Sequence, residues 1–169
     1  MIRILLSILA FYCITATAAD NGGESFNLYL VRHAEKQADG SRDPALTAAG
    51  IKRSEQLAGW LEDKEILKVW SSDYRRTRDT ATPLLNSSGL NLAIYDPRDQ
   101  EALAATLLLE KRNAVIIGHS NTIPELARLL CHCVIEDMDE SEYGRLIVIA
   151  AANNEISVQS LQQGQQFQP

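Results

Sequence analysis

Short apolar runs alternate along the chain with segments whose apolar residues recur every three or four positions. The runs predict buried strands, and they span Asn27–Val31, Leu67–Ser71, Leu90–Tyr95 and Ala114–Ile117. The intervening segments predict helices over about 47–61, 74–85, 99–110 and 123–130. Two later runs, Arg145–Ala150 and Ile156–Leu161, predict a hairpin of strands around Asn153–Asn154. Strands that alternate with helices indicate an α/β fold in which a mainly parallel sheet is covered on both faces.

The first 19 residues follow a different pattern. Arg3 is followed by an apolar run from Ile4 to Ile14, and then by the small residues Ala16-Thr17-Ala18. This order is typical of a secretory signal peptide with an A-x-A cleavage site. The run is too short for a membrane-spanning helix, which needs about 20 residues. We therefore expect residues 1–19 to direct the protein to a periplasmic or secreted location; an uncleaved N-terminal anchor is the alternative.

Composition limits the classes of partner. The chain has 169 residues, 46% of them hydrophobic, with 16 Lys and Arg against 22 Asp and Glu. This length suits one domain over residues 20–162, followed by a flexible Gln-rich tail at 163–169. The acidic balance argues against a nucleic-acid partner, and we expect no membrane span after signal cleavage. The sequence specifies no oligomeric state.

Three cysteines do not make a disulfide scaffold. Cys131 and Cys133 are open to two interpretations, a disulfide between them or two free thiols. The acidic stretch Glu136–Glu142 that follows is interpreted as a solvated loop.

Two histidines and several arginines occur where predicted strands end. His33 follows the first strand directly after Arg32, and His119 follows the fourth strand after Gly118. In open α/β sheets the ligand crevice lies at the carboxyl ends of the strands. Arg75, Arg76 and Arg78 lie where a helix begins, and both guanidinium groups and helix N-termini bind phosphate oxygens. The pattern therefore predicts an oxyanion pocket, with no metal-binding motif beside it.

The segment Arg32-His33-Ala34-Glu35 resembles the R-H-[GA] signature of the histidine phosphatase (phosphoglycerate mutase-like) superfamily. The resemblance continues through the motifs at 46–50, 71–81 and 117–121, and it covers about residues 27–150. It implies a three-layer α/β/α sandwich and a phosphate pocket formed by two histidines and two arginines. The family's second arginine falls on Arg76.

The resemblance also implies a reaction. His33 is expected to be the nucleophile that attacks phosphorus and forms a phosphohistidine. Arg32, Arg76 and His119 are expected to hold the phosphoryl oxygens, and Asn121 is a further candidate for substrate binding. We expect a small phosphorylated substrate, and no metal or other cofactor.

Protonation of the leaving group needs an acid, and two carboxyl groups after the third predicted strand are candidates. Glu101 fits a D-x-x-L-x-E register that begins at Asp96, although Asp99 stands where that pattern has Leu. Asp99 is the other candidate, and it is equally suited to be a helix N-cap.

The expected function is thus an exported, metal-independent phosphatase that hydrolyses a phosphomonoester through a phosphohistidine. Two alternatives remain open. One is a non-catalytic phospholigand-binding protein that lacks a competent acid. The other is a protein-phosphohistidine phosphatase, whose leaving group is an imidazole.

Overall fold

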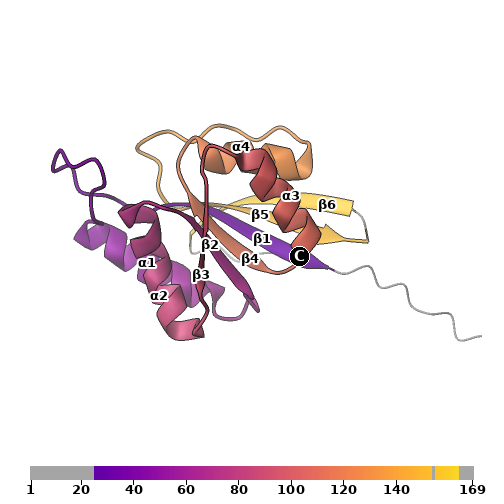
Figure 1. Cartoon of the computed structure of the whole chain (residues 1–169), viewed down its shortest axis with the longest axis horizontal. Helices are drawn as coiled ribbons and strands as arrows, with labels where there is room; N and C mark the ends of the chain where they lie inside the picture. Colours follow the sequence, from indigo (N-terminus) through magenta and orange to yellow (C-terminus); the bar gives the residue numbers. More distant parts are fainter. Residues whose placement is uncertain (1–24, 154, 164–169) are drawn as a thin grey trace, which may run out of the picture.

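A computed structural model describes residues 25–153 and 155–163 of the protein (Figure 1). The predicted signal peptide and residues 164–169 of the predicted tail lie outside these ranges. The elements in chain order are β1 Phe26–Arg32, α1 Ala48–Leu61, β2 Lys68–Ser72, α2 Arg75–Ser88, β3 Leu92–Tyr95, α3 Gln100–Glu110, β4 Ala114–Gly118, α4 Thr122–Cys131, β5 Arg145–Ala152 and β6 Glu155–Gln162.

The strands form one six-stranded sheet in the order β3-β2-β4-β1-β5-β6. The pairs β3–β2, β2–β4 and β4–β1 are parallel, whereas β5 lies antiparallel to β1 and β6 lies antiparallel to β5. The prediction of a mainly parallel sheet is therefore confirmed. The late strands pair in antiparallel fashion, as the predicted hairpin requires.

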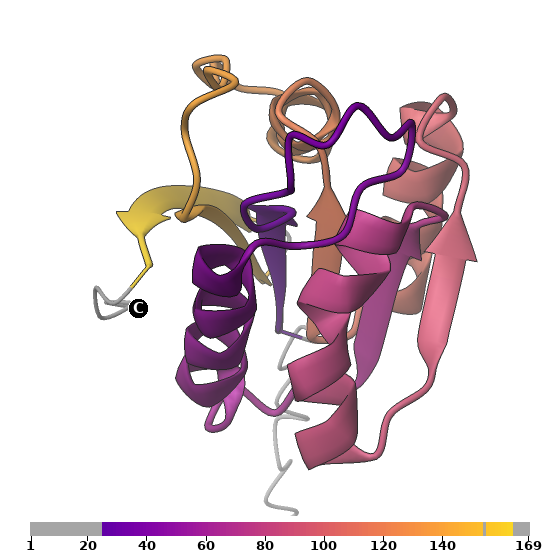
Figure 2. The same ribbon diagram turned by 90° about the vertical axis from the view of Figure 1, so that its left-hand side faces the viewer.

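Helices cover both faces of the sheet, which confirms the three-layer α/β/α architecture (Figures 1 and 2). In β1, Leu28 and Leu30 belong to the core shared with α3 and α4. Tyr29 and Val31 belong to the core shared with α1 and α2. Because both faces of β1 and β4 are buried, Leu28–Val31 and Ala114–Ile117 form unbroken apolar runs in the sequence. Each fully buried Leu or Ile contributes about 1.5–3 kcal/mol to folding.

The first turn of α1 buries a glycine and exposes the isoleucine that follows it. Thr47 is the N-cap, and its hydroxyl accepts a hydrogen bond from the amide of Gly50. Ile51, however, is 50% exposed. Gly50 instead packs on the preceding loop so closely that an added Cβ would lie 2.3 Å from the carbonyl oxygen of Glu35. This contact turns Gly50 inward, and the next residue, Ile51, therefore faces outward.

The parallel strands deliver their following segments to one edge of the sheet. In Figure 2 the segment after β1 and the segment before β5 both lie at the end toward which the arrowheads of β3 and β4 point. Residues that follow β1, β2 and β4 thus meet there. Among the helices of the described ranges, none has the length and apolar character needed to cross a bilayer.

Candidate active site

His33 is the first residue after β1, and the sheet fixes its backbone. Its amide donates a hydrogen bond of 2.9 Å to the carbonyl oxygen of Gly118, which extends the pairing of β1 with β4. The Nδ1 atom of the ring lies 2.8 Å from the carbonyl oxygen of Ala34. A carbonyl oxygen can only accept, so Nδ1 carries the proton and Nε2 keeps its lone pair.

The surroundings of His33 keep its ring neutral. Burial is the largest of the causes that lower the pKa of His33 to about 4, and the positive charges of Arg32 and Arg76 and the neighbouring His119 act in the same direction. The hydrogen bond to Ala34 acts in the opposite direction without offsetting them. At neutral pH the ring is therefore an uncharged imidazole with an available lone pair, the form that can act as a nucleophile.

His119 follows β4 and faces His33, with 5.5 Å between the ring centroids. Its Nε2 lies 2.9 Å from the hydroxyl oxygen of Ser72. Its Nδ1 lies 3.4 Å from Nη2 of Arg76, which can only donate. The ring therefore carries its proton on Nε2, donates it to Ser72, and presents the Nδ1 lone pair to Arg76.

Burial is also the main cause that lowers the pKa of His119 to about 4, followed by the charges of Arg76 and Arg32. A phosphoryl dianion beside Nδ1 would act against both arginine charges and favour the imidazolium. His119 is thus placed to become a positively charged donor when an anion binds.

Arg76 lies in the first turn of α2, and 15% of its side chain is exposed. Its guanidinium packs 4.4 Å above the ring of Tyr74 and lies 3.5 Å from a carboxylate oxygen of Asp43. Its buried Nε has no hydrogen-bond partner within the described part of the chain. The guanidinium therefore has donor capacity that no protein acceptor uses.

Arg32 is fully buried beside His33, and it binds the segment before β5. Its Nη1 donates to the carbonyl oxygens of Asp139, Glu140 and Glu142 at 3.0, 2.9 and 2.8 Å. Its Nη2 donates to the carboxylate of Glu140 at 2.9 Å. The guanidinium thus joins the floor of the site to residues 133–144, which we call the 133–144 loop.

Two more arginines hold this loop by its main chain. Arg128 of α4 donates to the carbonyl oxygen of Ile135 at 2.9 and 2.6 Å. Arg145 of β5 donates to the carbonyl oxygens of Glu136 and Asp137 at 3.2 and 2.5 Å.

A disulfide joins Cys131 to Cys133 where the loop begins, which decides between the two interpretations of these residues. The loop is thus anchored at both ends and over the site.

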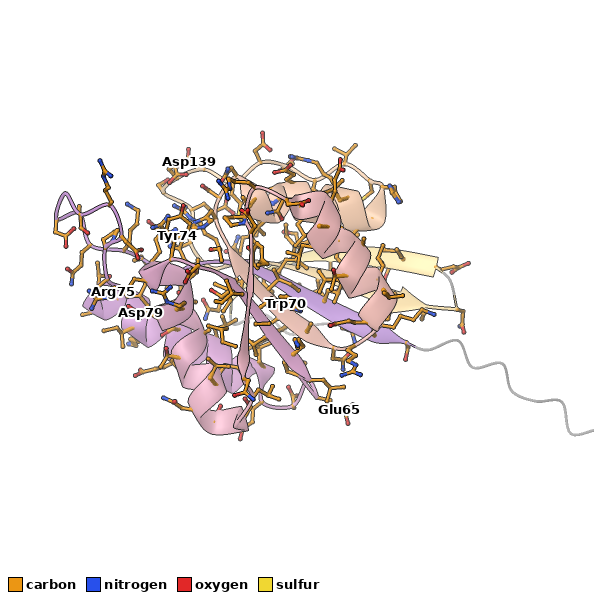
Figure 3. The ribbon with its side chains drawn as sticks, viewed as in Figure 1. Glu65, Trp70, Tyr74, Arg75, Asp79 and Asp139 are labelled. Carbon is orange, nitrogen blue, oxygen red and sulfur yellow. A yellow bond between two sulfur atoms is a disulfide. The ribbon has the colours of Figure 1, made fainter. Side chains whose placement is uncertain are left out.

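These side chains surround a cavity of about 330 Å³. Four of the predicted site residues line it, namely His33, Arg76, His119 and Asn121. Figure 3 shows Tyr74, which also lines the cavity, and Asp139 of the 133–144 loop on the same side of the molecule, away from Glu65.

The two predicted acids lie at the start of α3 and are not among the residues that line the cavity. Asp99 is the N-cap of α3, and its carboxylate accepts a hydrogen bond of 3.0 Å from the amide of Ala102. Glu101 is in the first turn of the same helix. The assignment of either residue as the acid stays a prediction.

Other residues of the site had no role in the sequence-based prediction. Ser72 is part of the Ser-rich motif, but only its contact with His119 shows what its hydroxyl does. Ser120 and Glu140 also line the cavity. Glu140 belongs to the acidic stretch interpreted as a solvated loop, and no local spacing signals its position, because three arginines bound to main-chain atoms place it.

Across residues 25–153 and 155–163, no group of three His, Cys, Asp or Glu side chains is placed to hold a metal ion. Three cationic side chains line the cavity, namely Lys36, Arg76 and Arg98, whereas the buried Arg32, a predicted site residue, is not among the lining residues.

Part of the chain matches a known protein family. The model of the histidine phosphatase superfamily (branch 1) matches residues 28–104. A protein of Escherichia fergusonii named "Probable phosphoglycerate mutase GpmB" is 36% identical over 92 residues, which are 51% of this chain and 41% of that protein. The chain thus spans about two fifths of the length of the curated relatives it matches.

Solved structures share the fold at lower identity. The α-ribazole phosphatase of Shigella flexneri is 19% identical with a TM-score of 0.64, and the match covers 80% of this chain and 96% of that one. The protein histidine phosphatase SixA, complexed with tungstate, is 16% identical with a TM-score of 0.64, covering 81% and 97%. A mycobacterial glucosyl-3-phosphoglycerate phosphatase with inorganic phosphate is 17% identical with a TM-score of 0.63, covering 82% and 97%. These solved structures show the shared fold, and residues 28–104 of the chain are similar to the histidine phosphatase superfamily.

Proposed function

We propose that the protein is an exported, metal-independent phosphatase that hydrolyses a phosphomonoester through a phosphohistidine at His33. The observation that carries the proposal is the state of the His33 ring. Its Nδ1 proton is held by the Ala34 carbonyl and its charged form is disfavoured, so an unprotonated Nε2 is available beside Arg76 and His119.

The reaction proceeds in two displacements. Nε2 of His33 attacks phosphorus, the bond to the leaving oxygen breaks, and water then cleaves the phosphohistidine. Negative charge on the phosphoryl oxygens is held by fixed donors, among which are Arg76 and a protonated His119, both of which line the cavity. One such donor lowers the barrier by about 2.7–4 kcal/mol. These groups supply the charge that a metal ion supplies in other phosphatases.

The proposed location rests on residues 1–19, whose order of charged, apolar and small residues is typical of a secretory signal. An exported enzyme meets phosphorylated molecules outside the cytoplasm. Fractionation of cells that express the full chain tests this part: we expect the processed protein in the periplasmic or secreted fraction.

The direct test of catalysis removes the nucleophile. His33→Ala should lower the turnover of p-nitrophenyl phosphate by at least about 10³-fold, because the covalent route is lost. EDTA should leave the wild-type rate unchanged. The matched control is His132→Asn, which alters the exposed third histidine at the end of α4; Asn tolerates its positive φ of 52°. Full activity of His33→Ala, or loss of wild-type activity in EDTA, contradicts the proposal.

A phosphohistidine protein is the second candidate substrate. SixA, a protein histidine phosphatase, is among the structures that share the fold. Comparing a phosphohistidine peptide with a set of phosphomonoesters separates the two substrate classes. Binding of phosphate or vanadate without turnover of either class would instead support a non-catalytic phospholigand-binding protein.

A further inference from the structure

Glu140 brings a carboxylate to the cavity from a part of the chain remote from the sequence motifs. Within the described ranges it is the only acidic residue that lines the cavity. Its side chain is 78% exposed, so the carboxylate reaches the site from the rim and can exchange protons with water.

The position of this carboxylate is set by contacts on both sides. Oε2 accepts from Nη2 of Arg32 at 2.9 Å, and Oε1 accepts from the hydroxyl of Ser120. The Glu140 carbonyl oxygen also binds Nη1 of Arg32 at 2.9 Å. The backbone and the side chain of Glu140 are thus fixed to the arginine that precedes His33.

The two carboxyl groups predicted from the sequence lack such placement. Asp99 uses its carboxylate to cap α3, and Glu101 does not line the cavity. A group that exchanges a proton with the leaving oxygen or with the attacking water must lie within hydrogen-bond reach of it.

We propose that Glu140 is the carboxyl group that transfers the proton in both displacements, an inference that rests on the proposed function. In the first step, Nε2 of His33 bonds to phosphorus, the P–O bond to the leaving group breaks, and the carboxylic acid of Glu140 gives its proton to the departing oxygen. In the second step, the carboxylate takes a proton from the water that attacks phosphorus, and the P–N bond breaks. Glu140 ends protonated, as it began.

Without a bound anion, the surroundings of Glu140 favour its carboxylate. The hydrogen bond from Ser120 is the largest of the causes that lower the pKa of Glu140, and the charges of Arg32 and Lys36 also lower it. A bound phosphoryl dianion competes for Arg32 and adds negative charge nearby, and both effects favour the protonated carboxyl group. Departure of the product alcohol leaves the carboxylate beside the phosphohistidine.

The test uses leaving groups of different basicity. An alkyl phosphate needs an acid for departure of its oxygen, whereas 2,4-dinitrophenyl phosphate does not. Glu140→Gln should lower kcat/KM for the alkyl phosphate by about 10²–10⁴-fold, and for the dinitrophenyl ester by less than about tenfold. With the dinitrophenyl ester the variant should also release one equivalent of dinitrophenolate in a burst and accumulate phosphorylated His33, because water is no longer activated.

Glu136→Gln is the matched control, because Glu136 is an exposed acid of the same loop that does not line the cavity. Its kcat/KM values for the alkyl phosphate and the dinitrophenyl ester should equal those of the wild type. Inorganic phosphate should still protect Glu140→Gln against thermal unfolding, which shows that the variant is folded with an intact pocket.

Several results would overturn the assignment. An equal fall of kcat/KM for both esters means that Glu140 is only structural, and a rise for both means that its carboxylate only obstructs Arg32. A leaving-group dependence that appears in Glu101→Gln instead of Glu140→Gln assigns the proton to Glu101. If the wild-type protein turns over both esters and Glu140→Gln behaves like it, this inference alone fails; if the wild-type protein turns over neither, the proposed function fails with it.

Discussion

The two histidines were predictable from the sequence because each directly follows a buried strand. Apolar runs in the sequence show where a buried strand ends, and a residue that follows such a run lies at the carboxyl end of that strand. The protonation of each ring was not predictable, because it depends on partners distant in the sequence. For His119 these partners are Ser72 and Arg76, which are 47 and 43 residues away.

A serine substitution tests this control of the His119 ring. Ser72→Ala removes the acceptor for the Nε2 proton and leaves a partly buried donor without a partner, which should cost about 1–3 kcal/mol of stability. It should also shift the ¹⁵N signals of His119 toward the other tautomer. Ser71→Ala is the control, because the Ser71 hydroxyl donates to the Ser72 carbonyl and not to a histidine. Unchanged His119 signals in Ser72→Ala would show that Arg76 alone sets the tautomer.

At the scale of elements, the alternating pattern predicted all ten helices and strands described within 25–153 and 155–163. It could do so because strands buried on both faces and capped amphipathic helices have local signals. The 133–144 loop is different: its course depends on Arg32, Arg128 and Arg145, which bind its carbonyl oxygens. No spacing within the loop encodes these contacts, so its contribution to the site was missed.

The junction of β4 with α4 gives a prediction at this scale. A Cβ at Gly118 would lie 2.7 Å from the Tyr95 hydroxyl and 2.9 Å from the Thr122 hydroxyl. Gly118→Ala should therefore destabilise the protein by about 1–3 kcal/mol and displace His119, which lowers phosphatase activity.

Gly59→Ala is the control for this change. An added Cβ at Gly59 in α1 meets no atom within 4 Å, so the substitution should stabilise the helix by about 0.5–1 kcal/mol. Urea unfolding measures both changes. Equal stability of the two variants would contradict the close packing at Gly118.

At the scale of the whole molecule, the negative net charge does not predict the positive charge of the site. The chain carries a net charge of −6, yet Arg32 and Arg76 meet the two histidines at one edge of the sheet. In the sequence, this clustering of positive charge at one site is indicated only by the order of the motifs. The folded arrangement couples the site to stability, because it keeps two imidazoles uncharged.

This coupling predicts the pH dependence of unfolding. The pKa of His33 is about 4 in the folded protein, against an ordinary value of 6.5, so the unfolded chain binds more protons between these values. The stabilisation that the uncharged His33 ring adds to the free energy of unfolding is fully present above pH 6.5 and is lost as the pH falls toward 4. The loss is on the order of 3 kcal/mol.

Urea unfolding of the wild type and of His33→Asn from pH 4 to 8 measures this contribution by difference. The asparagine variant should lose less stability on acidification than the wild type. Parallel curves for the two proteins would show that His33 titrates normally.

The three arginines that hold the 133–144 loop bind peptide oxygens, and every amino acid supplies those. Side chains of the loop other than that of Glu140 can therefore be exchanged during evolution while the path of its main chain persists. Substitutions in this loop can therefore change which substrates enter the cavity. A sequence search that uses only the residues of this loop would fail to detect relatives that share its main-chain path.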